Sequence, residues 1–141
     1  MDELDVRQKK IMSAAAAQAS KFYEQVVSES LVFTLDDGDG YLVFPVGDTE
    51  VVPFWSSRSR LVAIQKDHPK FSKWKITEES LSEFMTNSLS LFEEQNIRVG
   101  VNWSGQRLTG FDLSVSDLRQ NLQYWINRRN QGEQAAAPNG P

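Results

Sequence analysis

IRVGVNWSGQRLTGFDLSVSDLRQNL, residues 97–122, is the stretch from which the fold of this chain can be predicted. Over residues 97–103, β-branched and aromatic residues alternate with charged, small or polar ones, which is typical of a half-buried strand. Ser104 and Gly105 then predict a tight turn, because glycine tolerates the positive φ that such a turn requires. Residues 108–113 fit a returning strand, so the stretch predicts a hairpin.

A glycine and an amphipathic helix complete this unit. Gly110 interrupts the returning strand and predicts a bulge or a close approach of two backbones. Ser114 can cap a helix, with Asp117 in the first turn, where a carboxylate complements the helix dipole. A ββα unit cannot bury both of its faces alone, so the rest of the chain must supply a second layer. The apolar face of the predicted helix consists of Leu118, Leu122, Trp125 and Ile126.

The upstream sequence supplies that second layer. Apolar residues recur every three or four positions over residues 3–29, which predicts one long helix. The Asp- and Gly-rich turn at 36–40 predicts a hairpin between the strands on either side of it. Pro53 predicts that its strand lies at a sheet edge or ends there, because proline cannot donate an amide hydrogen bond. The remaining predicted elements are strands over 31–35, 41–46 and 51–55, a helix from Ser56 or Ser57 to about Lys66, and a helix capped by Thr77 that ends near Asn96.

The predicted order of elements is αβββααββα. This order favours an α+β fold with a sheet of about five mainly antiparallel strands covered by helices. Residues 1–129 form one predicted domain, and a chain of 141 residues is long enough to bury about two-thirds of its unfolded surface. Residues 130–141 have no periodicity and are rich in Pro, Gly and Ala, so they predict a disordered tail.

Composition and charge exclude several classes of protein. The chain has no cysteine, which removes disulfides, thiol nucleophiles and cysteine-ligated zinc and fits a reducing compartment. The net charge is −4 and no block of basic residues is present, which disfavours nonspecific nucleic-acid binding because that depends on neutralising phosphates. No apolar run approaches the roughly 20 residues that span a bilayer, and the N-terminus is unlike a secretory signal. We therefore expect a cytoplasmic protein that binds neither membranes nor nucleic acid.

Motifs for catalysis and cofactor binding are absent from the sequence. His68, the only histidine, precedes a proline in a predicted connection, and no G-x-S-x-G elbow presents a serine to it. One histidine and no cysteine leave few ligands for a transition metal, and no P-loop or G-x-G-x-x-G is present. Adjacent carboxylates such as Asp36 and Asp37 fall at solvated turns. We predict no catalytic residue, no metal and no cofactor, and a carboxylate-using enzyme is kept as an alternative to a non-enzymatic protein.

Four tryptophans are many for this length, and they allow two interpretations. The first is core packing, with each indole N–H at the edge of the core. The second is an aromatic-lined groove for a protein partner, although a strand would point Asn102 away from Trp103. Beside Trp55, two serines and Arg58 could bind a small anion at a helix N-terminus, or cap the helix and face solvent. The candidate binding residues are Trp55, Arg58, Asn102, Trp103, Ser104, Arg107 and Asp112.

Four motifs occur together in this chain: FYEQVV at 22–27, PFWSSRSRL at 53–61, GVNWSG at 100–105 and GFDL at 110–113. In combination they resemble a bacterial family, domain-of-unknown-function family 2750, over roughly residues 15–128. The resemblance implies a fold and a bacterial origin, and it implies no reaction.

Two functions of the binding class follow from these observations. We expect first an accessory protein that binds another protein through the surface around Trp55, Trp103 and Arg107. The second is an immunity-type inhibitor of a bacterial toxin, because a small acidic domain complements a basic nuclease electrostatically. The helix predicted over residues 3–29 either lies across the sheet or pairs with a second copy to give a homodimer.

Overall fold

The computed structural model describes residues 3–136, with side chains described for residues 14–132. The fold is α+β, as predicted. An antiparallel pair, β1–β4, and a four-stranded sheet in the order β2–β3–β5–β6 replace the single predicted sheet. The elements of the described chain are α1 (Glu3–Glu29), β1 (Leu31–Asp36), β2 (Phe44–Val46), β3 (Thr49–Phe54), α2 (Arg58–Asp67), the 3-10 turn η1 (Pro69–Phe71), β4 (Lys75–Ser80), α3 (Leu81–Glu83), the π-helical turn η2 (Phe84–Ser88), α4 (Leu89–Glu94), β5 (Arg98–Val101), β6 (Asp112–Leu113) and α5 (Val115–Ala136).

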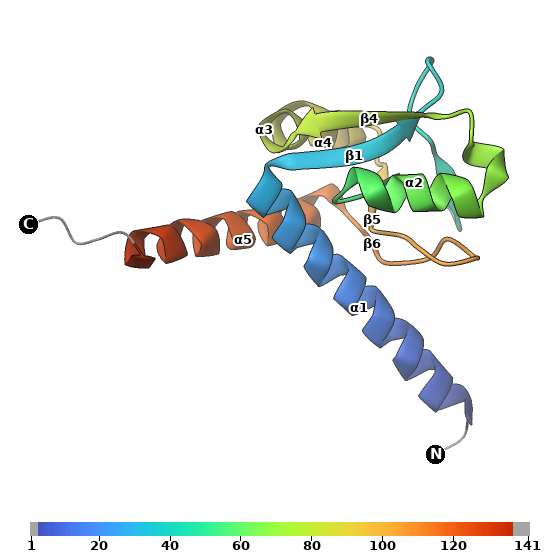
Figure 1. The fold of residues 1–141 in the computed structure, drawn as a ribbon, viewed down its shortest axis with the longest axis horizontal. Coiled ribbons are helices and arrows are strands. Elements are labelled where there is room, and N and C mark those ends of the chain that lie inside the picture. Colours follow the sequence, from blue (N-terminus) through green and yellow to red (C-terminus); the bar gives the residue numbers. More distant parts are fainter. Residues whose placement is uncertain (1–2, 137–141) are drawn as a thin grey trace, which may run out of the picture.

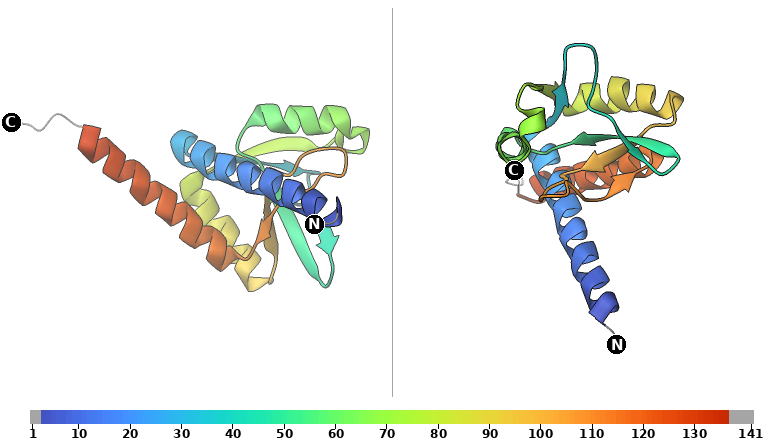
Figure 2. Two further views of the ribbon diagram at one scale, coloured as in Figure 1. Left: turned by 90° about the horizontal axis from the view of Figure 1, so that it is seen from below. Right: turned by 90° about the vertical axis from the view of Figure 1, so that its right-hand side faces the viewer.

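Helices cover both sides of the strands (Figure 2). α4 and α5 pack on one side over the larger apolar cluster, which includes Phe54 and Phe92. α2 packs on the other side over a second cluster, which includes Trp55 and Leu61. Because successive side chains of a strand point to opposite faces, β3 contributes to both clusters. The four-stranded sheet is therefore the middle layer, with apolar contacts on both faces.

Helix α1 confirms the long helix predicted over residues 3–29. Phe22 and Val26 are fully buried, where α1 meets α5, β1 and β5. The N-terminal part of α1 and the C-terminal part of α5 project from the body in different directions (Figure 1). The side chains of residues 3–13 lie outside those described, so a homodimer through α1 stays a prediction.

Strand β5 is buried on both faces, so the prediction of a half-buried strand is wrong. All residues from 99 to 103 are buried. The cause is that β5 runs parallel to β3 in the middle of the sheet, and parallel strands are covered on both faces. The alternation also breaks at Asn102, whose φ is 51°. The chain turns there, so that Val101 belongs to the larger cluster and Trp103 to the second one.

Pro53 lies in a central strand, so the predicted edge position is wrong. The predicted alternative, a strand that ends there, is close to the structure, because β3 ends one residue later at Phe54. β3 pairs with β5 on one flank. On the other flank its neighbour changes from β2, whose pairing reaches Val51, to β1, whose Phe33 bonds to Trp55. Pro53 falls at this change of neighbour, and its carbonyl accepts a hydrogen bond of 2.8 Å from Thr34 Oγ1. Proline is tolerated there because its missing N–H removes no ladder hydrogen bond.

Strand β1 pairs along its whole length with β4, which was not predicted. The predicted hairpin with the next strand is present only as a short turn, where the amide of Leu42 donates to the carbonyl of Leu35 at 3.0 Å. That hairpin reduces to one bridge, between Asp36 and Tyr41, and β2 pairs with β3 instead. Thr77 belongs to β4, so the helix cap predicted there is wrong. Ser80 is the cap, and its Oγ accepts the amide of Glu83 at 3.1 Å. Thr-Glu-Glu fits a helix start locally, but pairing with β1 overrides that local preference.

The C-terminal unit is a shorter hairpin and a longer helix than predicted. β6 has two residues, and residues 104–109 form a loop before it. Ser114 caps α5, as predicted, by accepting an amide hydrogen bond of 3.1 Å. α5 continues to Ala136, so the predicted disordered tail is wrong over 130–136, where Gln, Glu and Ala favour a helix. Residues 137–141 of that tail lie outside the described residues.

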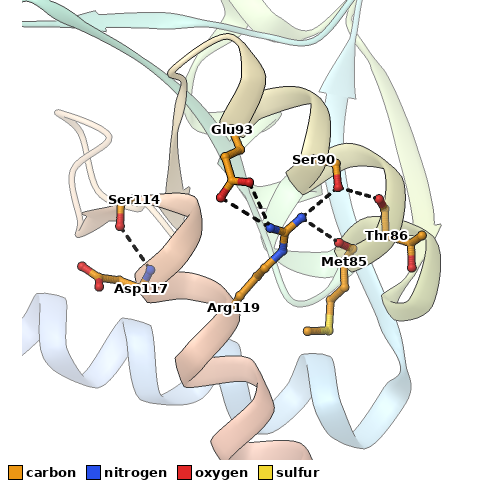
Figure 3. A network of polar contacts seen from close by, with 7 residues as sticks. All are labelled: Met85, Thr86, Ser90, Glu93, Ser114, Asp117 and Arg119. Atoms are coloured by element: carbon orange, nitrogen blue, oxygen red, sulfur yellow. Dashed lines mark hydrogen bonds and ion pairs between the residues drawn. The ribbon is translucent and has the colours of Figure 1, made fainter.

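Arg119 fastens α5 to the segment formed by η2 and α4 (Figure 3). Its Nη2 donates to Ser90 Oγ at 2.9 Å and to the carbonyl of Met85 at 3.3 Å. Its Nη1 lies 3.4 Å from both carboxylate oxygens of Glu93. Because the Glu93 side chain is 55% exposed, this ion pair contributes little, and the two neutral acceptors fix the guanidinium.

Candidate functional site

Trp55 and Trp103, the two aromatic residues of the predicted binding surface, are buried, with 0% and 6% exposure. Trp55 Nε1 donates to the carbonyl of Trp103 at 2.8 Å, and Trp103 Nε1 donates to the carbonyl of Phe111 at 2.9 Å. Each indole therefore satisfies its one donor inside the protein. The burial supports the interpretation as core packing, and these two rings form no exposed aromatic surface.

Two glycines make room for the Trp103 ring. A Cβ added at Gly100 would lie 2.5 Å from Trp103 Cε2, and one added at Gly110 would lie 2.6 Å from Trp103 Cδ1. Neither separation is possible without displacement of the ring or the backbone. A Cβ at Gly110 would also lie 2.9 Å from Gln18 Oε1, so the close approach at this glycine is to side chains and not, as predicted, to a second backbone.

Asn102 is the centre of a buried polar cluster at the end of β5. Its Oδ1 accepts the amide of Ser56 at 2.9 Å, and its Nδ2 donates to Ser56 Oγ at 3.0 Å and to the carbonyl of Gln18 at 3.3 Å. Ser56 Oγ also donates to Gln25, and the Gln18 amide donates to Ser104 Oγ. The cluster joins α1, the connection before α2 and the loop after β5. Asn102 and Ser104, both predicted to bind a partner, hold these three segments together.

A cavity of about 270 Å³ lies beside this cluster at the N-terminus of α2. Ser57 caps α2, as predicted, by accepting the amide of Arg60 at 3.3 Å. The guanidinium carbon of Arg58 lies 6.0 Å from the centroid of the Phe33 ring. Glu29 lines the same cavity, so a negative charge accompanies the positive one. The positive and negative charges that line the cavity therefore oppose each other and do not favour the binding of an anion.

The remaining predicted residues lie away from this cavity. Arg107 is exposed on the loop 104–109, and His68 Nε2 holds that loop through a contact of 3.0 Å to a carbonyl oxygen. Asp112 accepts a hydrogen bond of 2.6 Å from Arg98 Nε, in a partly exposed ion pair between β5 and β6. The predicted residues thus divide between the core, one cavity, one loop and one sheet edge, and they do not converge on a single site.

A groove of about 320 Å³ between α1 and α5 contains none of the predicted site residues. The Trp125 ring stacks on Tyr23 with centroids 6.3 Å apart, and the guanidinium carbon of Arg128 lies 5.4 Å from the Trp125 centroid. Arg129 Nη1 donates to the carbonyl of Val27 at 2.6 Å. A tryptophan followed closely by two arginines could suggest a binding surface in the sequence. The α1 residues that complete the groove are about 100 positions away, so the sequence does not show the groove itself. The lining residues are Glu24, Val27, Ser28, Trp125, Arg128 and Arg129.

Tyr41, Glu79 and Ser88 form a second polar cluster. The Tyr41 hydroxyl donates to Glu79 Oε2 at 2.9 Å, and Ser88 Oγ donates to Glu79 Oε1. The two hydroxyl oxygens of Tyr41 and Ser88 are 3.3 Å apart. A serine beside a carboxylate is the kind of group that the alternative enzyme would need. None of these three residues lines the cavity at the N-terminus of α2 or the groove between α1 and α5, so neither space would place a substrate against this cluster.

Two tyrosines predict how stability depends on pH. Burial raises the pKa of Tyr41 above 10.0, with Glu79 adding to the increase and the Ser88 hydrogen bond opposing it. Burial likewise raises the pKa of Tyr23, where the hydrogen bond from Asn121 opposes the increase. The folded protein therefore binds these protons more tightly than the unfolded chain does. The resulting stability is complete below the unfolded pKa of about 10 and is lost as the pH rises through the folded pKa values.

We expect the free energy of unfolding, measured by urea titration at a series of pH values, to fall from about pH 10 upward. Tyr41→Phe should make this fall shallower, although it lowers stability at neutral pH by removing a hydrogen bond. Tyr124→Phe is the control, because the Tyr124 side chain is 60% exposed. Equal alkaline slopes for wild type and Tyr41→Phe would contradict the argument.

Among the side chains that the structure describes, those of residues 14–132, no group of three or more from His, Cys, Asp or Glu is placed to hold a metal ion. Within residues 3–136, no helix has both the length and the apolar character that crossing a bilayer requires.

Comparison with known proteins gives a family match. The family model described as "Protein of unknown function (DUF2750)" matches residues 19–122. This range contains the four motifs at 22–27, 53–61, 100–105 and 110–113. The comparison with curated proteins finds no match for the chain.

Proposed function

We propose that this chain, which belongs to the DUF2750 family of proteins of unknown function, is a non-enzymatic binding protein. Because the function of the family is unknown, the role is inferred from the surface of the chain itself. The protein holds an acidic segment of a partner protein between α1 and α5. The observation that carries this proposal is the position of Trp125, Arg128 and Arg129 in one groove. Tryptophan and arginine are among the residues most enriched at the energetic centres of protein interfaces.

The groove provides an apolar surface with fixed charges beside it. Trp125 is partly buried and packs against the larger apolar cluster. Arg128 lies over the Trp125 ring, and Arg129 is held by the carbonyl of Val27. The Arg128 guanidinium, placed over the ring in this way, loses less conformational freedom when it pairs with a carboxylate. A partner segment with one apolar side chain flanked by carboxylates fits this arrangement.

The charge of the groove differs from that of the whole chain. The chain has a net charge of −4, whereas the groove is lined by two arginines and by Glu24. Glu24 lies 3.7 Å from the ammonium group of Lys21, which offsets part of its charge. Arg128 therefore attracts an acidic segment to the groove, whereas the net negative charge of the whole chain repels it, which favours this site over others.

Site-specific photocross-linking in cells tests the proposal. A photoreactive amino acid at Ser28, which lines the groove, should capture a partner through a segment rich in Asp and Glu. The same amino acid at Val62 is the control, because Val62 is 53% exposed on α2. Arg128→Glu should lower capture at Ser28 by about tenfold or more, because a central charged contact becomes repulsive.

Arg107→Glu is the matched variant, because it makes the same change of charge on the exposed loop 104–109. It should leave capture at Ser28 unchanged. Three results would argue against the proposal: identical proteins captured at Ser28 and Val62, captured segments with no excess of acidic residues, or capture that Arg128→Glu does not reduce.

A further inference from the structure

Strand β4 is an unpaired edge of the two-stranded sheet. β1 is its neighbour on one flank, and no other element of the described chain packs extensively against it. In Figure 1, β4 lies on the outer side of the body, with β1 between it and helices α1 and α2. Edge strands expose unpaired N–H and C=O groups and so can pair with another strand.

The hydrogen bonds of β1 show which β4 residues direct their backbone groups outward. The amide of Leu81 donates to the carbonyl of Ser30 at 2.9 Å, which continues the β1–β4 ladder by one pair. Antiparallel pairs alternate between bonded and non-bonded positions. Residues 75, 77 and 79 therefore bond to β1, whereas residues 76, 78 and 80 direct their N–H and C=O groups to the open flank.

Strand β1 follows the same alternation, which supports this assignment. Phe33 and Leu35 are the partners of Glu78 and Ile76 in the register. Both bond on the far flank of β1, Phe33 with Trp55 at 2.7 and 2.9 Å and Leu35 with the amide of Leu42 at 3.0 Å.

The sequence of β4 is complementary to itself in one antiparallel register. When two copies pair about a two-fold axis at Thr77, Lys75 of each copy lies opposite Glu79 of the other. Opposite charges and a Thr–Thr pair are both favourable cross-strand contacts. Pairing about Glu78 instead would place two glutamates opposite each other, which is unfavourable. The register about Thr77 also aligns Ile76 with Glu78, so that their outward N–H and C=O groups meet.

We propose that a second copy of this chain pairs with it along β4, antiparallel and centred on Thr77, to form a continuous sheet β1–β4–β4–β1. Glu79 is already fixed by hydrogen bonds from Tyr41 and Ser88, and a carboxylate has further acceptor sites for the Lys75 ammonium. The interface is short, so the dimer is weak and depends on protein concentration. This inference does not depend on the proposed function, because the α1–α5 groove contains no residue of β4.

A disulfide at the two-fold axis tests the register. The chain has no cysteine, so Thr77→Cys introduces a single thiol. Thr77 would face its own copy in a non-hydrogen-bonded pair, where Cα atoms are about 4.5 Å apart and within disulfide range. Thr77→Cys should give a covalent dimer under mild oxidation. Val62→Cys, at an exposed position of α2, is the control and should remain mainly monomeric.

Sedimentation equilibrium tests the backbone pairing. Glu78→Pro removes an N–H that points to the open flank and leaves the β1 ladder intact, so it should raise the dimer Kd by about tenfold or more. Lys75→Glu should also raise the Kd without any change to the backbone. The proposal is overturned if wild type is monomeric at millimolar concentration, if neither variant changes the Kd, or if Thr77→Cys oxidises no faster than Val62→Cys. Any of these results would mean that the open flank of β4 does not pair with a second copy of this chain.

Discussion

Replacing Gly100 with alanine should lower the free energy of unfolding by about 3 kcal/mol, as expected when a close-packed core is overfilled. The new Cβ would lie 2.5 to 2.8 Å from three atoms of the Trp103 ring. The ring cannot move aside easily, because its Nε1 donates to the carbonyl of Phe111 and its centroid lies 5.7 Å from the centroid of the Phe44 ring. Urea-induced unfolding followed by circular dichroism measures the loss.

Gly40→Ala is the matched control. A Cβ at Gly40 meets no atom within 4 Å, so its effect on stability should be below about 0.5 kcal/mol. A double-mutant cycle then identifies the cause. If the indole is the obstacle, Gly100→Ala should cost at least about 1 kcal/mol less in a Trp103→Phe background than in wild type. Additive effects would mean that the loss arises in the backbone of β5 and not at the ring.

The local sequence predicts those elements whose signals are local. The helix over residues 3–29 follows from its apolar period, and Ser57 and Ser114 were recognisable as helix caps. The pairing of β1 with β4 is not recognisable in the sequence, because Thr77 and the glutamates after it have the local pattern of a helix start. Strand pairing depends on the partner that the tertiary fold supplies, and a single segment does not contain that information.

The candidate site shows the same division. The sequence does not distinguish an exposed tryptophan from a buried one. Trp103 can therefore be assigned to the core only from the structure, in which Gly100 and Gly110 lie against its ring. The α1–α5 groove depends on a contact between Val27 and Arg129, 102 positions apart, that no periodicity records. Polar residues of strands are also ambiguous, because Asn102 is as compatible with a ligand as with a buried network.

Replacing Asn102 with alanine should cost about 4 kcal/mol of stability, the second of the two largest effects. The side chain is fully buried and makes hydrogen bonds to the amide and hydroxyl of Ser56 and to the carbonyl of Gln18. Alanine leaves the amide of Ser56 buried without this partner and removes one of the two hydrogen bonds of Ser56 Oγ, and an unsatisfied buried group costs about 1–3 kcal/mol. Alanine also disfavours the φ of 51° that asparagine tolerates at this position.

Two further variants separate these causes. Asn102→Gly removes the side chain but accepts the positive φ, so it should be more stable than Asn102→Ala by roughly 1 kcal/mol. Asn121→Ala, which loses one partly buried hydrogen bond to Tyr23, should cost only about 1 kcal/mol. A cost below about 1 kcal/mol for Asn102→Ala would mean that the polar cluster contributes little to folding.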